Sequence, residues 1–437
     1  MKAQPQQPFC VSWERAITIL PWALSALAFV IMLFTSLLLP SQLGPTPHDW
    51  FKEYASALWQ GNLHVGEGSK WQDCKWDQSF FEGKCYLYWG IVPALIRLLV
   101  PFFTNRFVCI LSAAVVLFFL SKILLKLARI QKNTDEVDWL LASTTCLACF
   151  FSSGFFGMAL MSRVYEESIN VGHAFGLAGV FFGLSFLPGM PSSKSVGKLT
   201  LASLYFALAA LTRITWLPVF ALFSGFVFFS DRRKTLIPLV ALALVMGFQG
   251  WLNWIRFGSP LDFGVRYQSS YLRYSYLDEL GRGLLSWNFV PNFISYYFLR
   301  LFPSGSLVVL NPKGFLETLV LKNRLYEAPH TLLLTLPISF LAFFKRKELV
   351  ESIKKVWSPI VSVLPLLLPT ILLNAIVNRY QFEVCASFML ATIPFLLSRS
   401  ATVSSKEYSA QLVANLIGIS FSLYFDFELL QRFWRLL

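Results

Sequence analysis

The stretch NRFVCILSAAVVLFFLSKILLKLARI, residues 105–130, begins with one arginine, continues as a long apolar run and ends among Lys122, Lys126 and Arg129. About 20 apolar residues in helical conformation are enough to cross the hydrocarbon core of a bilayer. Basic residues at the end of such a run are typical of its cytoplasmic end. The stretch therefore predicts a transmembrane helix that ends in the cytoplasm.

Apolar runs of this kind recur through the chain. Of its 437 residues, 56% are hydrophobic and only 14% are charged, whereas a soluble protein carries about 25% charged residues. The first run starts near residue 16, is longer than a signal-peptide core and is followed by no small-residue cleavage pattern, so we expect it to be retained. The chain is predicted to be an all-α polytopic membrane protein.

The net charge of +13 reports topology and does not indicate a nucleic-acid partner, because the basic residues lie in short loops between apolar runs. Placing every basic cluster in the cytoplasm predicts eleven spans, an N-terminus inside and a C-terminus outside. The spans are predicted near 16–40, 106–128, 138–160, 169–188, 199–212, 214–230, 235–255, 329–344, 356–377, 380–398 and 409–425.

Two apolar segments are excluded from the spans. Counting residues 88–103 as a crossing would put the basic end of 105–130 outside, so this segment and 288–310 are expected to lie on the outer surface or to enter the membrane only partway. The chain then forms a single transmembrane domain, 1–437, with large outer loops at 41–105 and 256–328. No internal repeat of the transporter kind is visible.

The cysteines fall into two groups. Cys74 and Cys85 share the first outer loop, where an extracytoplasmic environment would favour a disulfide. Cys146 and Cys149 lie in the apolar run TTCLACFF, which predicts packing in spite of the CxxC spacing. No His, Cys and Asp residues have metal-ligand spacing, so no metal site is predicted.

Acids and arginines gather on the predicted outer side. Ionisable groups at the edges of spans are costly unless they are paired or line a wet cavity. Each residue alone is explained by snorkelling or capping, but the set favours one interfacial site. Its members outside the first loop are Arg163, Glu166, Arg213, Arg266, Arg379 and Glu383.

The stretch TPHDWFKEYASALWQGN, residues 46–62, predicts a helix along the outer surface. Thr46 is expected as the N-cap, with Pro47 at the first helical position and Gly61 ending the helix. Asp49 and Glu53 then share one face. An acid in the first turn also simply complements the helix dipole, so Asp49 is open to a structural and a catalytic interpretation.

The order of these segments resembles the GT-C superfamily of membrane glycosyltransferases, which use polyprenyl-phosphate-linked sugars. It is most similar to bacterial relatives of the protein O-mannosyltransferase and dolichyl-phosphate-mannose type. The resemblance lies in an acid followed by an aromatic and a surface helix, then an aromatic-proline segment, an Arg-led second helix and an LTR turn. The matching stretches are HDWFKEYASALWQGN, DQSFFEGKCYLYWGIVPALIRLLVPFF, NRFVCILSAAVVLFFLSKILLKLARI and LAALTRITWLPVFAL.

The resemblance implies an inverting transferase on the outer face of the cytoplasmic membrane, with an aspartate of the first outer loop as general base. That role falls on Asp49, with Asp77 as its competitor; Glu53 stands in for the second acid that often accompanies this aspartate, since Trp50 follows Asp49. The lipid phosphate would meet Arg163, Arg213, Arg266, Arg379 and Lys84, and Glu166 and Glu383 complete the set. Tyr88, like Tyr86 and Trp89, would stack on sugar or join the aromatic belt at the interface, which we favour.

The implied donor is a polyprenyl-phosphate sugar, the expected partners are membrane lipids, and no cofactor is required. Two other functions fit the same residues: a transporter or flippase of a lipid-linked sugar or another anion, and a non-catalytic scaffold of GT-C type. The residues specify no sugar, acceptor or oligomeric state.

Overall fold

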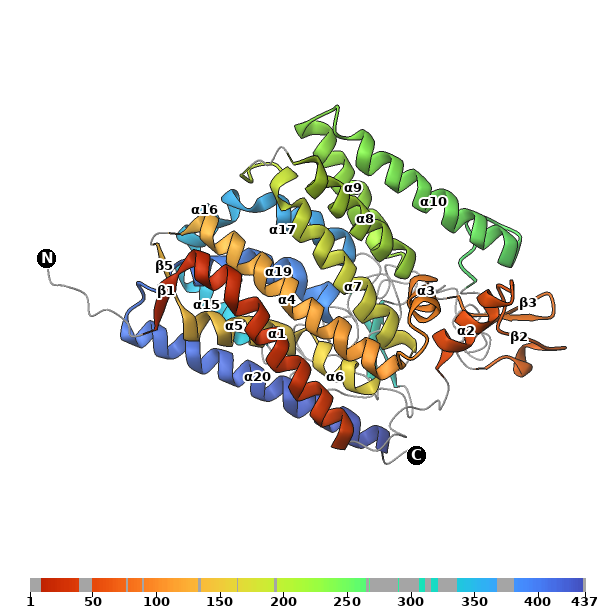
Figure 1. Ribbon diagram of the computed structural model, residues 1–437. Coiled ribbons are helices and arrows are strands. Elements are labelled where there is room, and N and C mark those ends of the chain that lie inside the picture. The colour runs from red at the N-terminus through yellow and green to blue at the C-terminus, as the bar shows by residue number, and fades with distance from the viewer. Residues whose placement is uncertain are drawn as a thin grey trace, which may run out of the picture.

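The helices of the computed structural model lie side by side in one bundle, with a small sheet beyond one end (Figure 1). The structure describes residues 9–38, 49–75, 78–88, 90–132, 135–162, 164–191, 195–264, 267, 290, 306–310, 316–320, 336–367 and 381–434.

Several helices are long and apolar enough to cross a membrane. In the described ranges there are four, α1 (Trp13–Leu38), α4 (Asn105–Gln131), α7 (Val164–Gly183, continued to Phe186) and α10 (Leu236–Phe257). A fifth span arises if α5 (Trp139–Ser152) and α6 (Phe155–Met161), which meet at 53°, count as one broken helix. The chain is thus helical and suited to a membrane, as predicted.

The other helices of the bundle are shorter or lie at its C-terminal side. The apolar ones are α8 (Val196–Thr212), α9 (Trp216–Ser230), α17 (Trp357–Val363, continued as the 3-10 turn η7, Leu364–Leu366) and α19 (Gln381–Ser398). The chain also forms α15 (Pro337–Leu341), the 3-10 turn η6 (Ala342–Lys345), α16 (Arg346–Lys355) and α20 (Ser405–Trp434). At 1.5 Å per residue, α8 and α9 are shorter than the roughly 30 Å of a hydrocarbon core.

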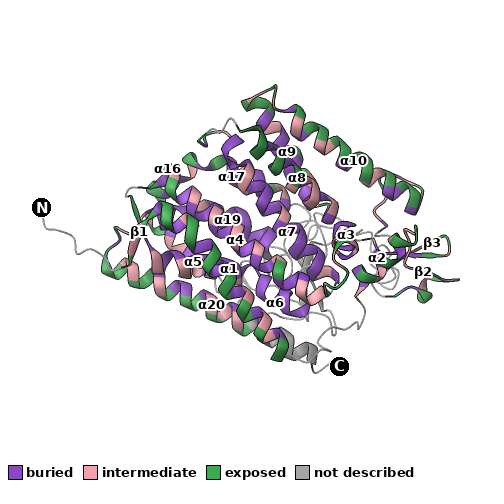
Figure 2. Cartoon of the chain, viewed as in Figure 1, coloured by how far each residue is buried: buried purple, intermediate pink, exposed green. Residues whose placement is uncertain are grey.

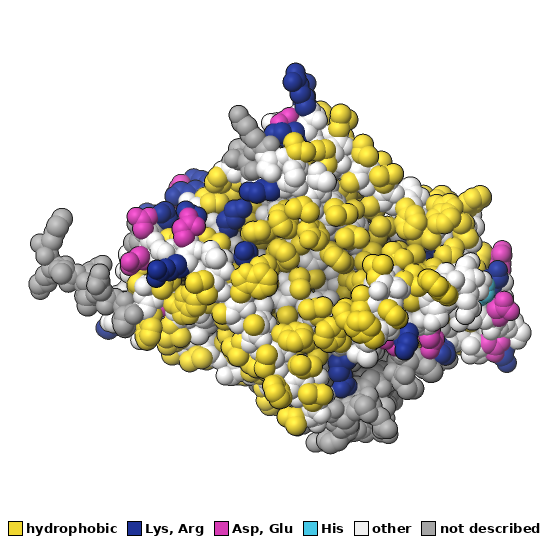
Figure 3. All heavy atoms as spheres, viewed as in Figure 1, with side chains coloured by type: hydrophobic (Ala, Val, Ile, Leu, Met, Phe, Trp, Pro, Cys, Tyr) yellow, Lys and Arg dark blue, Asp and Glu magenta, His cyan; other side chains and the backbone are white. Residues whose placement is uncertain are grey.

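A broad hydrophobic surface lies between two charged regions of the molecule (Figure 3). Large apolar side chains are exposed on the bundle helices, such as Trp22 on α1 and Leu244 on α10, at 64% and 69%. A soluble protein rarely leaves so large an apolar surface uncovered, whereas lipid tails would cover it. The apolar surface therefore agrees with a membrane-embedded bundle.

The predicted cytoplasmic clusters that the structure describes gather at one end of the bundle, the basic end. There β1 (Cys10–Ser12) pairs with β5 (Glu136–Asp138), and Gln131 of α4 bonds to Ser352 of α16. Its basic residues are Arg129, Lys132, Lys198, Arg232, Arg233, Lys234, Lys345, Arg346, Lys347, Lys354, Lys355, Arg399 and Lys406. The common location of these clusters is the geometry that the charge pattern predicted.

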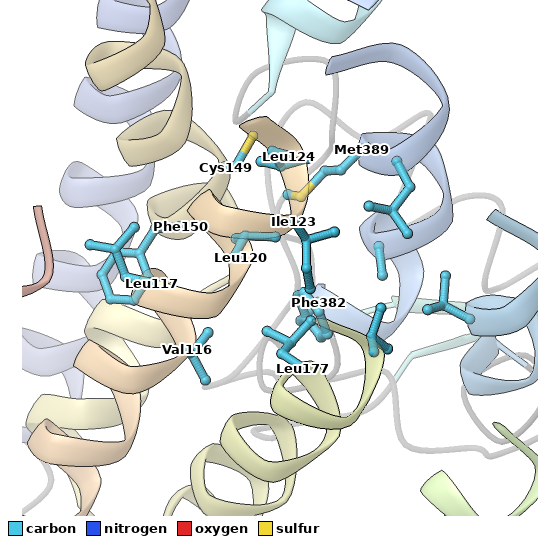
Figure 4. Close-up of a cluster of buried hydrophobic side chains, with 14 of the residues drawn as sticks. Val116, Leu117, Leu120, Ile123, Leu124, Cys149, Phe150, Leu177, Phe382 and Met389 are labelled. Atoms are coloured by element: carbon cyan, nitrogen blue, oxygen red, sulfur yellow. The ribbon is translucent and has the colours of Figure 1, made fainter. Parts of the chain in front are cut away.

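Most side chains of helix α7 are buried in the bundle (Figure 2). An added Cβ at Gly176 would lie 2.2 Å from the Trp216 ring, and one at Gly183 would lie 2.7 Å from Phe223. Side chains of α4, α5, α7 and α19 interdigitate beside it, among them Leu120, Phe150, Leu177 and Phe382 (Figure 4). Because these contacts leave little freedom, α7 holds its polar side chains in fixed positions.

The first predicted outer loop is built on α2 (Trp50–Trp59), α3 (Val92–Leu99) and a small sheet. The sheet has the order β2 (Gly66–Glu67), β4 (Lys84–Tyr86), β3 (Ser79–Phe81), and the 3-10 turn η1 (Trp71–Asp73) lies between β2 and β3 in the chain. The predicted disulfide between Cys74 and Cys85 is present, with 5.5 Å between the Cα atoms.

Helix α3 is eight residues long, about 12 Å, so it is too short to cross a bilayer. It packs against Trp50, Phe51 and Tyr54 of α2, as expected for a segment outside the spans. Gly90 lies so close to α8 that a Cβ there would be 2.1 Å from the Leu211 carbonyl oxygen. Of the second such segment, 288–310, most residues lie outside the described ranges; β6 (Ser306–Leu310) pairs with β7 (Leu316–Val320).

Candidate functional site

Asp49 is the N-cap of α2. Its Oδ1 accepts a hydrogen bond from the Lys52 backbone N–H at 3.1 Å, and the helix begins at Trp50. The expectation that Thr46 caps this helix and Asp49 occupies its third position is therefore wrong, because the aspartate itself satisfies a first-turn N–H. Gly61, with φ of +80°, follows the C-cap Gln60 and ends the helix as predicted.

The second carboxylate oxygen of Asp49 joins three helices. Oδ2 accepts the backbone N–H of Asn105 at the start of α4, at 3.1 Å, and lies 3.6 Å from Arg97 Nε of α3. The Asp49 side chain remains 20% exposed. These contacts fix the position of the carboxylate, while part of its side chain stays exposed. A general base needs both a fixed position and access to the reacting hydroxyl.

Arg97 is the centre of this cluster. Its side chain is 1% exposed and its Nη2 lies 2.8 Å from the Glu167 carboxylate in the first turn of α7. Glu166, predicted to bind substrate, is also fully buried in that turn. The sequence argument did not single out Arg97, although it is the one charged residue in the apolar segment 88–103 and that isolation was a usable signal.

A second buried ion pair lies one to two turns further along α7. Arg213, the C-cap of α8, places Nη2 2.6 Å from Glu383 Oε1 of α19. His173 Nε2 lies 3.8 Å from the same oxygen, and Trp216 Nε1 donates to His173 Nδ1 at 3.3 Å. The structure thus brings the predicted Arg213 and Glu383 together, from positions 170 residues apart. His173 is packed among Phe155, Trp216 and Phe382.

Other predicted residues have different surroundings. Glu53 forms an ion pair with Lys75 at 3.2 Å, which connects α2 to the loop that follows it. Lys84 is exposed on β4, and Tyr88 is half-buried. Tyr86 packs its buried ring on Phe257, 5.4 Å between centroids, which corrects the expected place in an interfacial aromatic belt.

Five of the residues singled out from the sequence lie outside the described residues: Asp77, Trp89, Arg163, Arg266 and Arg379.

Arg256 and Tyr54 attach α2 to α10. The Arg256 guanidinium donates to the Tyr54 hydroxyl and lies over its ring, 5.4 Å from the centroid. Burial raises the pKa of Tyr54, and the neighbouring Arg256 acts in the opposite direction. The surface helix that carries Asp49 is therefore held by α3, α4 and α10 together.

The two buried ion pairs, Arg97–Glu167 and Arg213–Glu383, define the site end of the bundle together with Asp49 and His173. Burying charged groups costs several kcal/mol each before their mutual attraction is counted. Across the described ranges, no three His, Cys, Asp or Glu side chains are arranged to hold a metal ion. What this end offers is a fixed carboxylate, two arginines and neighbouring acids.

No protein-family model and no curated protein matches the sequence of this chain.

Proposed function

We propose that the chain is a membrane glycosyltransferase of GT-C type, which moves a sugar from a polyprenyl phosphate to an acceptor hydroxyl. The proposal includes eleven spans with the basic end in the cytoplasm and the site end on the outer face of the cytoplasmic membrane. The observation that supports it best is the Asp49 carboxylate, fixed by α2, α3 and α4 with one open side at the end of the bundle.

In the proposed reaction, Asp49 accepts the proton of the acceptor hydroxyl as that oxygen attacks the anomeric carbon. The new C–O bond forms on one face of the sugar while the bond to the phosphate oxygen breaks on the other. The polyprenyl phosphate leaves with the electron pair, so the configuration inverts. Arg97 and the Asn105 backbone N–H orient the carboxylate, which favours proton transfer by fixing its geometry. Asp77 remains the competing base.

The leaving phosphate needs cationic partners, and arginine forks suit phosphate oxygens. Arg213 is the described arginine of the proposed set, and Glu383 holds its guanidinium at the site end. Arg163, Arg266, Arg379 and Lys84 complete the proposal, with Tyr88 and Glu166 near the sugar.

A transporter or flippase is supported less well than a transferase. Substrate paths of transporters carry ionisable groups near the bilayer midplane. Here the buried pairs involve the first turn of α7, the C-cap of α8 and the first turn of α19, which are helix ends. A non-catalytic scaffold would share this arrangement, so transfer activity distinguishes it.

The test measures sugar transfer by the protein in liposomes that contain a panel of polyprenyl-phosphate sugars. Asp49→Asn keeps a good N-cap and is expected to lower transfer by about 10²–10⁴-fold, the usual contribution of a general base. Asp73→Asn is the matched control in the same loop, since the bonds of the Asp73 carboxylate within the described residues go to Ser69 and Lys70. Full transfer by both Asp49→Asn and Asp77→Asn would show that the general-base proposal is wrong.

A further inference from the structure

Asn170 of α7 is a buried amide without hydrogen-bond partners. The residue is 0% exposed, and among the described residues neither Oδ1 nor Nδ2 has a partner. Leaving a buried polar group unpaired costs about 1–3 kcal/mol, and such groups are rare in native proteins. A hydrogen-bond partner from outside the chain would remove this cost for Asn170.

Two other buried amides have at least one partner. Asn415 of α20, also 0% exposed, donates to the hydroxyls of Thr144 and Thr145 at 3.0 and 2.9 Å, although its Oδ1 has no partner among the described residues. Gln131 bonds to Ser352 through both its oxygen and its nitrogen. Asn170 differs from both, because neither atom of its amide has a partner in the described part of the chain.

His173 carries a second unpaired group on the same face of α7. Because Trp216 Nε1 donates to Nδ1, the neutral ring carries its proton on Nε2. That Nε2 has no hydrogen-bond partner in the described part of the chain, since Glu383 Oε1 is 3.8 Å away. Residues three apart are neighbours on a helix surface, so the amide and the imidazole N–H lie close together.

The surroundings of this pair are strongly polar. Three residues before Asn170, Glu167 joins Arg97, whose Nη1 is also buried and without a hydrogen-bond partner among the described residues. Three residues after Asn170, His173 faces the Arg213–Glu383 pair. A hydroxyl group both donates and accepts, so one hydroxyl can donate to Asn170 Oδ1 and accept a hydrogen bond from Asn170 Nδ2 or His173 Nε2.

We propose that Asn170 binds a hydroxyl group supplied from outside the chain, at a hydrated position between the two buried ion pairs. Buried waters with two to four polar partners are regular parts of proteins, and a sugar hydroxyl has the same hydrogen-bonding chemistry. An ordered water as the source is independent of the proposed function, whereas a sugar hydroxyl as the source rests on it.

Thiol labelling in liposomes tests the proposal. Asn170→Cys and the matched control Asn415→Cys are made in a background that lacks the half-exposed Cys10 and the site-end Cys109. The remaining free thiols, Cys146, Cys149 and Cys385, are buried in apolar surroundings. A thiol reacts with a small charged methanethiosulfonate as the thiolate, which forms only where water reaches it.

The expected result is labelling of Asn170→Cys at least about tenfold faster than that of Asn415→Cys. Equal, slow labelling of the two variants would overturn the proposal. If Asn170→Cys does not fold, a high-resolution density map of the wild-type protein replaces it: a discrete peak bonded to the Asn170 amide supports the proposal, and a bond to a protein group overturns it.

Added lipid identifies the source of the hydroxyl. Protection of Asn170→Cys by undecaprenyl-phosphate mannose, but not by undecaprenyl phosphate alone, assigns the hydroxyl to a sugar. Labelling that neither lipid changes assigns it to water. Failure of the proposed function appears separately, as absence of transfer by the wild-type protein in spite of rapid labelling at position 170.

Discussion

The two ends of the bundle use the same charged residue types in opposite ways. At the basic end, the pairs Arg129–Glu14 and Lys345–Glu407 are partly exposed. At the site end, Arg97–Glu167 and Arg213–Glu383 are almost fully buried. Exposed pairs contribute about 0–1 kcal/mol, whereas a buried pair is costly to form and more costly to break. Stability alone would be served as well by apolar residues, and this contrast supports the proposal that the site end carries the chemistry.

The largest effect on stability is expected from Arg97→Met. This substitution leaves the buried Glu167 carboxylate without its cationic partner, which should lower the free energy of unfolding by about 3–5 kcal/mol. The matched variant at the basic end, Arg129→Met, should cost about 0–1 kcal/mol because its pair with Glu14 is solvated. Denaturant unfolding in detergent measures both, and equal losses would remove the contrast between the ends.

The disulfide comes next. Cys74 and Cys85 are 11 residues apart, and a loop of that size stabilises by about 3 kcal/mol through loss of unfolded-state entropy. Replacing both cysteines with serine should speed backbone hydrogen exchange in the loop that connects β4 to Gly90 and α3. Hydrogen exchange at the basic end should stay unchanged. Hydrogen exchange read separately at the two ends checks this; equal loss of protection at both would contradict it.

A smaller effect is expected at Gly176 of α7. A Cβ there would lie 2.2 Å from the Trp216 ring, so Gly176→Ala should cost about 1–3 kcal/mol through overpacking. A Cβ added at Gly247 of the peripheral α10 would have no neighbouring atom within 4 Å among the described residues. Gly247→Ala is therefore expected to be neutral or stabilising by about 0.5–1 kcal/mol. Thermal unfolding of the two variants measures the difference, and a loss at Gly247 as large as at Gly176 would refute it.

The smallest effect concerns pH. Burial raises the pKa of Tyr54 above its ordinary value of about 10. The neutral hydroxyl therefore contributes fully to the free energy of unfolding below pH 10. As the pH rises through the raised pKa, the hydroxyl ionises and this contribution is lost. Tyr54→Phe should therefore show a shallower loss of stability above pH 10, in unfolding followed from pH 8 to 11. If the variant lost stability above pH 10 as steeply as the wild-type protein, Tyr54 would not be the source of that loss.

The sequence could predict features that depend on local composition. Basic clusters at the ends of apolar runs identified one end of the bundle, and two cysteines in one polar loop identified the disulfide. The N-cap was misassigned because Thr46 and Asp49 both suit that position, and only the contact with Lys52 distinguishes them.

Long-range pairing could not be predicted. Arg213 and Glu383 were both selected for their position at span edges, but their 2.6 Å contact depends on how α8 and α19 pack. Arg97 was overlooked because its segment is otherwise apolar, and the partners of its charge are supplied by α2 and α7. Asn170 has no sequence signal, since an amide within a span is distinguished only by the partners that it lacks.

The most direct test of the account is sugar transfer by the double variant Arg97→Met/Glu167→Met. Replacing both charges should restore the free energy of unfolding to within about 1 kcal/mol of the wild-type value, because no charge is left buried alone. The account predicts that transfer from polyprenyl-phosphate sugars nevertheless falls by about 10²-fold or more, because Asp49 loses the guanidinium that orients it. Transfer at the wild-type rate by a stable double variant, or no transfer by the wild-type protein, would contradict the account.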